Sequence, residues 1–171
     1  MNRHKIIFLT VAILILNVSS ALACLCDKRS TFSESLEQSA AIFSGKVIKA
    51  EYQKKHITDK SDKSKAKPTD NKAEYEVLVI TFEVERWWKG GTTTEVSLFT
   101  GQAKLRNGTI WVTSCDNEYI LGEKYLVFAY GDKDRLVSGS VCSLTKKLNE
   151  AKKELGLLGE GVEPEKTNRV N

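Results

Sequence analysis

The sequence predicts a mainly β protein of one domain, in which five to six strands close, or nearly close, into a barrel. Residues 75–88 (YEVLVITFEVERWW) alternate apolar and polar side chains with the period of two that is typical of a half-buried strand. Shorter β-branched and apolar segments surround this strand, and glycine-containing turns separate them. Helical features occur in only two segments, so a short N-terminal helix and a C-terminal amphipathic helix would flank the sheet. Long strands with a glycine bend, in one small domain, favour a closed arrangement over a flat sheet.

Residues 1–23 have the features of a secretory signal peptide. Basic residues precede a short apolar run, 6–16 (IIFLTVAILIL), and the segment ends in Ala-Leu-Ala before Cys24. The run is shorter than the about 20 apolar residues of a transmembrane helix, so a membrane anchor is the less favoured alternative. Cleavage after Ala23 would make Cys24 the first residue of the mature protein. A surface lipoprotein acylated at Cys24 is the closer alternative, because lipoproteins are also cleaved immediately before a cysteine.

The mature chain begins with a helix and a bent strand. Thr31 and Glu34 match the capping box, which predicts a short helix over 33–40. The apolar, β-branched segment 41–52 predicts a strand, with a bend or bulge at Gly45.

Residues 53–73 differ in kind from the segments on either side. They include seven lysines and three aspartates, and Ile57 is their only large aliphatic residue. Such a composition buries little apolar surface, so we expect a solvated loop between two strands.

The strand at 75–88 would place Leu78, Ile80, Phe82 and Val84 on one face. Because neighbouring strand residues point to opposite faces, we expect Trp87 in the core and Trp88 at the barrel rim, or the reverse. This interpretation is favoured over an exposed stacking platform for nucleic acid or glycan.

Four further strands are expected after this one, at 95–100, 109–113, 124–130 and 136–141. Asn107-Gly108 and Gly131-Asp132 are turn signals beside two of them. Leu144, Leu148, Ala151 and Leu155 then recur at helical spacing, with Gly156 as the expected end of the helix. Residues 160–171 are expected to be a disordered tail.

All four cysteines lie after the leader: Cys24, Cys26, Cys115 and Cys142. An even number in an oxidising compartment predicts two disulfides. A Cys24–Cys26 bond would close a small, strained ring. Two pairings therefore remain open, and both join the N-terminus to Cys115 and Cys142. A four-thiolate zinc site is less favoured, because Cys115 and Cys142 lack the close spacing of such ligands.

The composition excludes several classes of function. Without its leader the chain has 24 basic and 22 acidic residues, a net charge too small to indicate nucleic acid as the main partner. Its single remaining histidine, His56, lies in the lysine-rich segment, so no nucleophile–histidine arrangement can be built on the strands. No phosphate-binding glycine motif occurs. We expect a monomeric, secreted or periplasmic protein that is not an enzyme, needs no cofactor and has no membrane span.

Several motifs together resemble a known family. They are the Cys24-x-Cys26 start and the segments AIFSGKVIKAE, FEVERWWKG, CDNEYILGEKYLVFAY and VCSLT. Their order is similar to that in the N-terminal domain of the tissue inhibitors of metalloproteinases, within the wider netrin-like module, and the chain looks like a short, bacterial-type member. The resemblance covers residues 24–159. It implies an OB-fold barrel and the pairings Cys24–Cys115 and Cys26–Cys142.

The resemblance also implies a function, the inhibition of zinc metalloproteinases. The free amine and carbonyl of Cys24 would bind the catalytic zinc of the protease, and Leu25 would enter its specificity pocket. Cys26 would lock this segment in place, and Thr113 and Ser114 would make secondary contacts. The segment 53–73 corresponds to a hairpin loop that contacts the protease in some family members. The alternative is a non-inhibitory, extracytoplasmic binding module with the same fold.

The sequence also departs from the family pattern. A charged trio, Asp27-Lys28-Arg29, follows Cys26 where the inhibitors typically have apolar residues and proline. The four cysteines of the sequence do not allow a third disulfide, and the resemblance does not extend to the separate C-terminal domain of animal members.

Overall fold

The computed structural model describes residues 24, 26, 30–54, 75–132 and 134–165 of the 171-residue chain. Most of these residues belong to one antiparallel-dominated sheet, whose strands lie in the order β1-β2-β3-β6-β5-β7, with β4 paired to β3. In chain order the elements are α2 (Phe32–Gln38), β1 (Ala41–Lys54), β2 (Tyr75–Lys89), β3 (Glu95–Leu105), β4 (Ile110–Trp111), β5 (Lys124–Asp132), β6 (Arg135–Ser138), β7 (Lys146–Lys147), the 3-10 turn η1 (Leu148–Glu150) and α3 (Lys152–Leu158).

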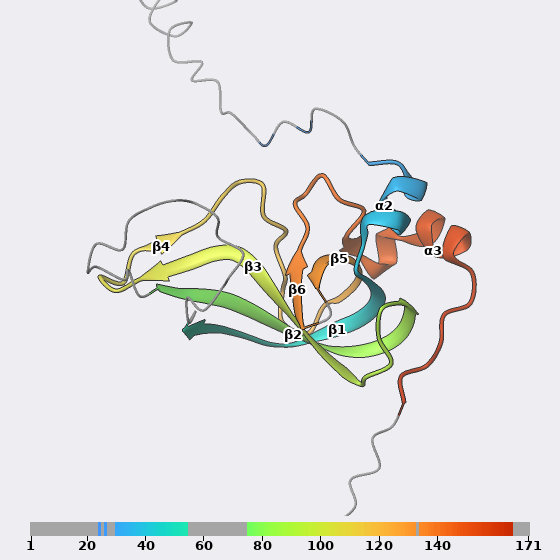
Figure 1. The fold of residues 1–171 in the computed structure, drawn as a ribbon, viewed down its shortest axis with the longest axis horizontal. Coiled ribbons are helices and arrows are strands. Elements are labelled where there is room, and N and C mark those ends of the chain that lie inside the picture. The colour runs from blue at the N-terminus through green and yellow to red at the C-terminus, as the bar shows by residue number, and fades with distance from the viewer. Residues whose placement is uncertain (1–23, 25, 27–29, 55–74, 133, 166–171) are drawn as a thin grey trace, which may run out of the picture.

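The sheet closes on itself, because β1 pairs with β5 as well as with β2. The result is a ring of five strands, β1-β2-β3-β6-β5, in which only the β3–β6 contact is parallel. The predicted mainly β class is confirmed, and the ring is not a regular barrel. The far ends of β1, β2 and β3, together with β4, extend beyond the ring (Figure 1).

The bend predicted at Gly45 is confirmed as an irregularity in the β1–β2 ladder. Ser44 pairs with Arg86 but Gly45 pairs with Val84, so the register shifts between them. A side chain at Gly45 would lie 2.7 Å from the carbonyl oxygen of Glu83. The two strands therefore approach each other here more closely than a Cβ atom allows.

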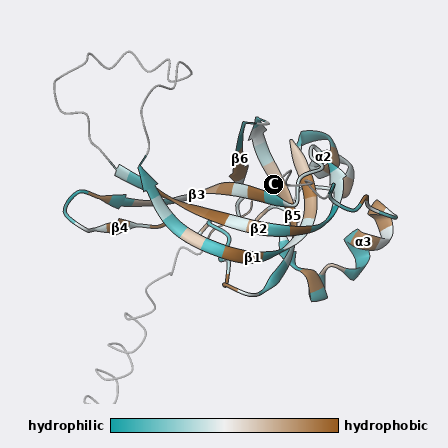
Figure 2. Ribbon diagram, turned by 90° about the horizontal axis from the view of Figure 1, so that it is seen from below, coloured by the Kyte–Doolittle hydropathy of each residue, from teal (hydrophilic) through white to brown (hydrophobic). Residues whose placement is uncertain are grey.

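Two apolar clusters lie on opposite sides of β1 and β5. The first fills the ring and includes Phe43, Phe82 and Val127. The second includes Ile42 and Phe128 and lies under the two helices. Neighbouring residues of these strands point to opposite faces, and both faces are buried where the clusters lie. This accounts for the hydrophobic colour over part of β1 and of β5 (Figure 2).

Of the two adjacent tryptophans, one lies in the core and the other at its edge, as predicted. Trp87 is buried in the ring cluster, and its indole Nε1 donates to the Thr93 carbonyl oxygen at 2.8 Å. Trp88 is partly buried against the second cluster, and its Nε1 donates to the Gly159 carbonyl oxygen at 2.9 Å.

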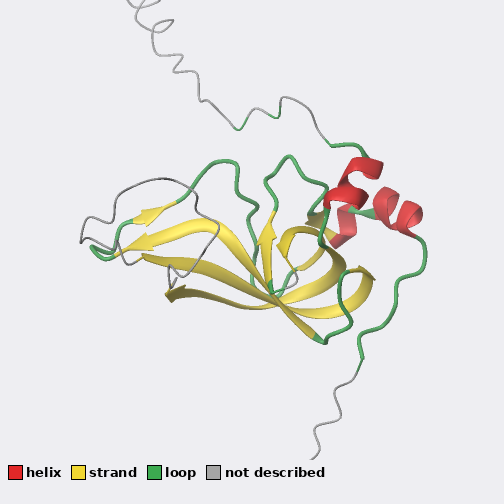
Figure 3. Ribbon diagram, viewed as in Figure 1, coloured by secondary structure: helices red, strands yellow, loops and turns green. Residues whose placement is uncertain are grey.

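Both helices pack at one end of the sheet (Figure 3). The predicted capping box of α2 is present: Glu34 N–H donates to Thr31 Oγ1 at 3.3 Å, and Thr31 N–H donates to Glu34 Oε2 at 2.8 Å. The helix spans Phe32–Gln38, close to the predicted 33–40.

Several predicted boundaries in the sheet need correction. Gln53 and Lys54, expected in the loop, are the last residues of β1. Strand β3 continues to Leu105, whereas β4 and β6 are shorter than predicted. The Asn107-Gly108 turn is confirmed, with Gly108 at φ +83°. The Gly131-Asp132 turn is wrong: both residues lie in β5 and pair with β6, so the chain reverses after Asp132.

The C-terminal region also differs from the prediction. The helix begins at Lys152 rather than near Leu144, because the chain before it forms the short strand β7 and the 3-10 turn η1. Gly156 lies inside the helix, and the positive φ of Gly159, +69°, marks its end. Residues 160–165 are not disordered: Val162 forms a two-way backbone bridge with Trp87, and Glu165 N–H donates to the Thr92 carbonyl oxygen at 2.7 Å.

The signal peptide predicted at 1–23, residues 55–73 of the loop predicted at 53–73, and the last six residues lie outside the described residues. Among the described residues, no helix has the length and apolar character needed to cross a membrane.

Candidate functional site

The candidate site is the edge where the N-terminal cysteines join the sheet. Cys24 is bonded to Cys115, with Cα atoms 5.1 Å apart, and Cys26 to Cys142, with Cα atoms 5.6 Å apart. Of the two pairings that composition left open, the structure has the one implied by the resemblance. Because all four thiols are in disulfides, the four-thiolate zinc alternative is wrong.

The two loops that hold these disulfides are hydrogen-bonded to each other. Val141 N–H donates to the Cys115 carbonyl oxygen at 2.8 Å. The Asn117 side-chain amide donates to the carbonyl oxygens of Gly139 at 2.7 Å and Ser140 at 3.2 Å. The N-terminal cysteines are therefore bonded to one connected platform, not to two independent loops.

Tyrosine side chains anchor this platform to the ring cluster. Tyr119 packs edge-on against Phe82 and shares a hydrogen bond of 2.8 Å with Ser138. Burial raises the pKa of Tyr119 to about 12, against the opposing effect of the Ser138 hydrogen bond, so its phenol stays neutral at physiological pH. The Tyr125 hydroxyl accepts the Ile120 N–H at 3.0 Å. These contacts make the platform an extension of the core.

Thr113 and Ser114 directly precede Cys115, in a turn that contains Asp116. Thr113 N–H donates to Asp116 Oδ2 at 3.3 Å, and Asp116 N–H donates to the Thr113 carbonyl oxygen at 3.3 Å. Thr113 is half-buried and Ser114 is exposed. The Cys24–Cys115 bond thus brings these two predicted residues into the same edge as Cys24, whereas Leu25 lies outside the described residues.

One conspicuous part of this edge was missed from sequence. Ile110, Trp111 and Val112 are each more than half exposed, and they lead into Thr113. The exposed tryptophan is thus Trp111, whereas Trp87 is buried and Trp88 half-buried. The signal available was the short apolar run after the Asn107-Gly108 turn, which fits an exposed two-residue edge strand as well as a buried strand.

The described residues contain no group of three or more His, Cys, Asp or Glu side chains placed to hold a metal ion. The chelating atoms predicted for a partner's zinc are backbone atoms of Cys24, which its disulfide does not use. Their chemistry thus depends on the N-terminus of the mature chain, not on a metal held by this protein.

Comparison of the chain with protein-family models finds no match, and none of the curated proteins matches it significantly.

Proposed function

We propose that this protein, after cleavage before Cys24, is an inhibitor of zinc metalloproteinases that binds the protease zinc through its N-terminal residue. The observation that carries the proposal is the double attachment of Cys24 and Cys26 to a connected platform. Chain termini ordinarily fray, so this arrangement supports a role in presenting the N-terminus rigidly.

The α-amine and the carbonyl oxygen of one residue form a five-membered chelate ring with a metal. An α-amine has a pKa near 8, so displacing its proton at pH 7 costs only about 1 kcal/mol. A catalytic zinc keeps one position open for water, and this chelate can occupy it. Inhibition then replaces the attacking water and leaves nothing on the metal to hydrolyse a peptide.

Rigid presentation supports affinity because a bound peptide otherwise loses conformational freedom. Ordering a flexible segment costs about 0.5–1.5 kcal/mol for each immobilised side chain. The two disulfides hold Cys24 and Cys26 before the partner arrives. Leu25 lies between them in the chain and would fill the specificity pocket, with Thr113 and Ser114 as flanking contacts.

The proposed compartment is extracytoplasmic, either secreted or periplasmic. Two disulfides in the described residues are compatible with an oxidising environment. The predicted leader would deliver the chain there and create the free amine of Cys24.

The direct test adds one alanine before Cys24 of the mature protein. The Cys24 amine then becomes an amide without a basic lone pair, so inhibition should fall by orders of magnitude. Thermal stability should hardly change, because the platform contacts are untouched. A panel of zinc metalloproteases is assayed with the native and the extended protein, after mass spectrometry confirms a free Cys24 amine.

A matched variant, Leu25→Gly, keeps the chelate and removes the pocket side chain. It should weaken inhibition by roughly 2–3 kcal/mol, the burial value of a leucine side chain. Equal potency of native and extended protein, or no inhibition of any panel member, would favour the non-inhibitory binding module. Acylation of Cys24 would exclude the proposal, because it occupies both the thiol and the amine.

A further inference from the structure

Cys24 and Cys26 are separated by one residue, but the cysteines to which they are bonded lie in two different loops. The first loop, 112–123, connects β4 with β5, and the second loop, 139–145, connects β6 with β7. Two cysteines so close in the chain can be bonded to both loops only if the loops are held at a matching distance from each other. Residues that fix this distance therefore control how the N-terminal segment is attached.

The backbone pairing between the two loops is short. In the part of the chain that the structure describes, it is an isolated bridge between Asp116 and Ser140. Beside this bridge, Val141 N–H donates to the Cys115 carbonyl oxygen at 2.8 Å. An isolated bridge offsets only part of the conformational entropy that two ordered loops lose, so side-chain contacts have to contribute to their spacing.

Asn117 makes such a contact from the first loop to the second. Its side-chain Nδ2 donates to the Gly139 carbonyl oxygen at 2.7 Å and to the Ser140 carbonyl oxygen at 3.2 Å. A side-chain amide has two N–H donors, so both bonds can form at the same time. One half-buried side chain thus holds two successive carbonyl groups of the second loop.

The Gly139 carbonyl group also connects Asn117 to the core. A carbonyl oxygen can accept two hydrogen bonds, and the second donor here is the Ser138 hydroxyl at 3.0 Å. Ser138 shares a hydrogen bond of 2.8 Å with the phenol of Tyr119, which packs against the ring cluster. This network begins and ends in the first loop and passes through the start of the second, so it holds the two loops together and to the ring.

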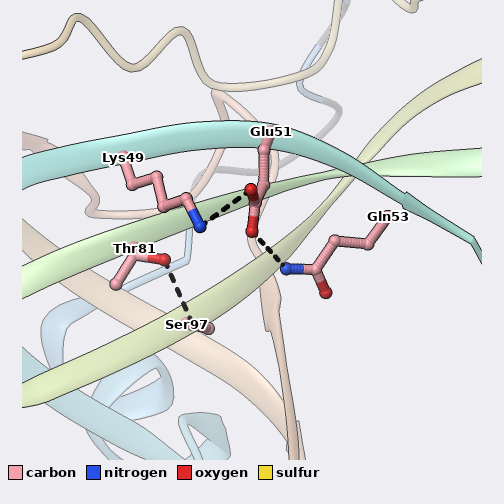
Figure 4. Close-up of polar contacts among 5 residues, drawn as sticks. All are labelled: Lys49, Glu51, Gln53, Thr81 and Ser97. Carbon is pink, nitrogen blue, oxygen red and sulfur yellow. Dashed lines mark hydrogen bonds and ion pairs between the residues drawn. The ribbon is translucent and has the colours of Figure 1, made fainter.

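Other side-chain contacts on the sheet connect residues that backbone pairing already holds together (Figure 4). Within β1, Lys49 Nζ lies 2.8 Å from one Glu51 carboxylate oxygen, and Gln53 Nε2 donates to the other at 2.8 Å. Thr81 and Ser97 share a hydrogen bond of 3.3 Å and are direct partners in the β2–β3 ladder. The loss of these contacts would leave the ladders in place, whereas the contacts between the two loops have no ladder beside them.

We propose that Asn117 is a positioning residue: it sets the spacing of the two loops, and this spacing selects the disulfide pairing and fixes where Cys24 is presented. Before oxidation the cysteines place no constraint on the loops, so hydrogen bonds between the loops decide their spacing. A disulfide requires Cα atoms about 4.4–6.8 Å apart, and the two observed pairs, at 5.1 Å and 5.6 Å, meet this requirement together. The presentation of Cys24 to a protease rests on the proposed inhibitory function, whereas the selection of the pairing is independent of it.

The test is oxidative refolding of the reduced mature protein in a glutathione buffer. Peptide mapping then identifies the pairs, with cleavage after Leu25 to separate Cys24 from Cys26. The native protein should regain the observed pairing. Asn117→Ala and Asn117→Asp both remove the two donors, so the ratio of non-native to native pairing should rise by about tenfold or more. The aspartate variant should be the worse of the two, because its carboxylate faces two carbonyl oxygens.

Asn107→Asp is the matched control, because it makes the same chemical change in an exposed turn. The side-chain Oδ1 of Asn107 accepts the Thr109 N–H at 3.0 Å, and aspartate retains this oxygen. The variant should refold with the native pairing. The same mixture of pairings from this control would overturn the proposal, because the added charge would then be the cause.

Hydrogen exchange of the oxidised protein is a second measurement that needs no refolding. The Val141 N–H should exchange about tenfold faster in Asn117→Ala than in the native protein, whereas amides of the β1–β5 ladder should be unchanged. Native pairing in both Asn117 variants, or unchanged exchange at Val141, would overturn the proposal.

Inhibition is measured with natively paired Asn117→Ala, separated from other products by chromatography. It should inhibit less than the native protein, and Asn107→Asp should inhibit equally well. Equal inhibition by all three proteins would overturn the role of Asn117 in presenting Cys24. If no protease is inhibited by the native protein, the proposed function fails, and refolding and exchange still decide whether Asn117 sets the loop spacing.

Discussion

Glu154 is a buried acid, and its hydrogen bond with Lys146 connects the C-terminal helix α3 to the sheet. Lys146, in β7, donates from its Nζ to Glu154 Oε1 at 2.8 Å, and Glu154 in α3 is only 8% exposed. Burial acts to raise the pKa of Glu154, but the hydrogen bonds from Lys146 and from the Glu154 backbone outweigh it, so the pKa is lowered from 4.5. The ionised form is therefore favoured in the folded protein, and ionisation of this one residue stabilises the helix position.

Glu154→Gln should lower the free energy of unfolding at pH 7 by about 1.5–3 kcal/mol, the typical contribution of a hydrogen bond to a charged group. Because the folded-state pKa is depressed, the stabilisation is present above the unfolded value of 4.5 and is lost as pH falls through the folded value. Urea denaturation at pH 7 and pH 3 measures this, and the two proteins should converge at the lower pH.

Glu51→Gln is the control at a solvated position. The pKa of Glu51 is also lowered, first by its hydrogen bond with Lys49, but the contact lies on the exposed face of β1, where water screens it. This variant should match the native protein at both pH values. An equal loss of stability in both variants would show that burial of Glu154 has no special role.

Two glycines show that β1 and α3 differ in whether they can accept a side chain at a glycine position. Gly45 lies in buried β1, where an added Cβ would come within 2.7 Å of the Glu83 carbonyl oxygen. Gly156 lies within α3, and an added Cβ there would have no neighbour within 4 Å. Strand β1 requires glycine at this position, because its backbone approaches β2 closely. Helix α3 does not require glycine, and glycine there only adds conformational freedom to the unfolded chain.

Substitution of these glycines by alanine should therefore have opposite effects. Gly45→Ala should destabilise the protein by about 1–3 kcal/mol, because the β1–β2 ladder must shift. Gly156→Ala should stabilise it by roughly 0.5–1 kcal/mol, because alanine is the better helix former. Thermal denaturation of the two variants under one set of conditions measures both signs. A stabilised Gly45 variant would mean that the bulge can relax without cost.

At the scale of the whole molecule, the two disulfides are long-range connections. They join residues 91 and 116 positions apart, and both end in the N-terminal segment. Closing loops of this length stabilises a protein by roughly 4–5 kcal/mol in the chain-entropy model. The same bonds that would present the N-terminus to a partner thus contribute to folding.

Removal of one disulfide at a time should show how much each bond contributes to the stability of the fold. Cys26→Ser with Cys142→Ser should cost about 2–5 kcal/mol, and so should Cys24→Ser with Cys115→Ser. Chemical denaturation of each double variant provides the measurement. Peptide mapping of the unreduced native protein should find the same two pairs, and a Cys24–Cys142 peptide would contradict the observed connectivity.

Local signals determined much of this fold from the sequence alone. The alternation at 75–88 predicted β2, the Thr31–Glu34 pattern predicted the start of α2, and Gly45 and Asn107-Gly108 predicted a bulge and a turn. Each depends on residues close together in the chain, where backbone preference and side-chain direction act directly. The even cysteine number and the predicted leader likewise indicated that both disulfides join the N-terminal segment to Cys115 and Cys142, but not their pairing.

The remaining features depend on contacts between distant segments, and only the tertiary structure decided them. The segment from Leu144, predicted as one helix, forms the strand β7, a 3-10 turn and then α3, because β5 offers a pairing edge at Lys146. Residues 160–165 are ordered because Trp87, far back in the chain, supplies backbone partners. The pairing of the cysteines arises in the same way. Composition and local patterns do not determine these contacts, because strand register and the closure of the ring decide which distant residues come together.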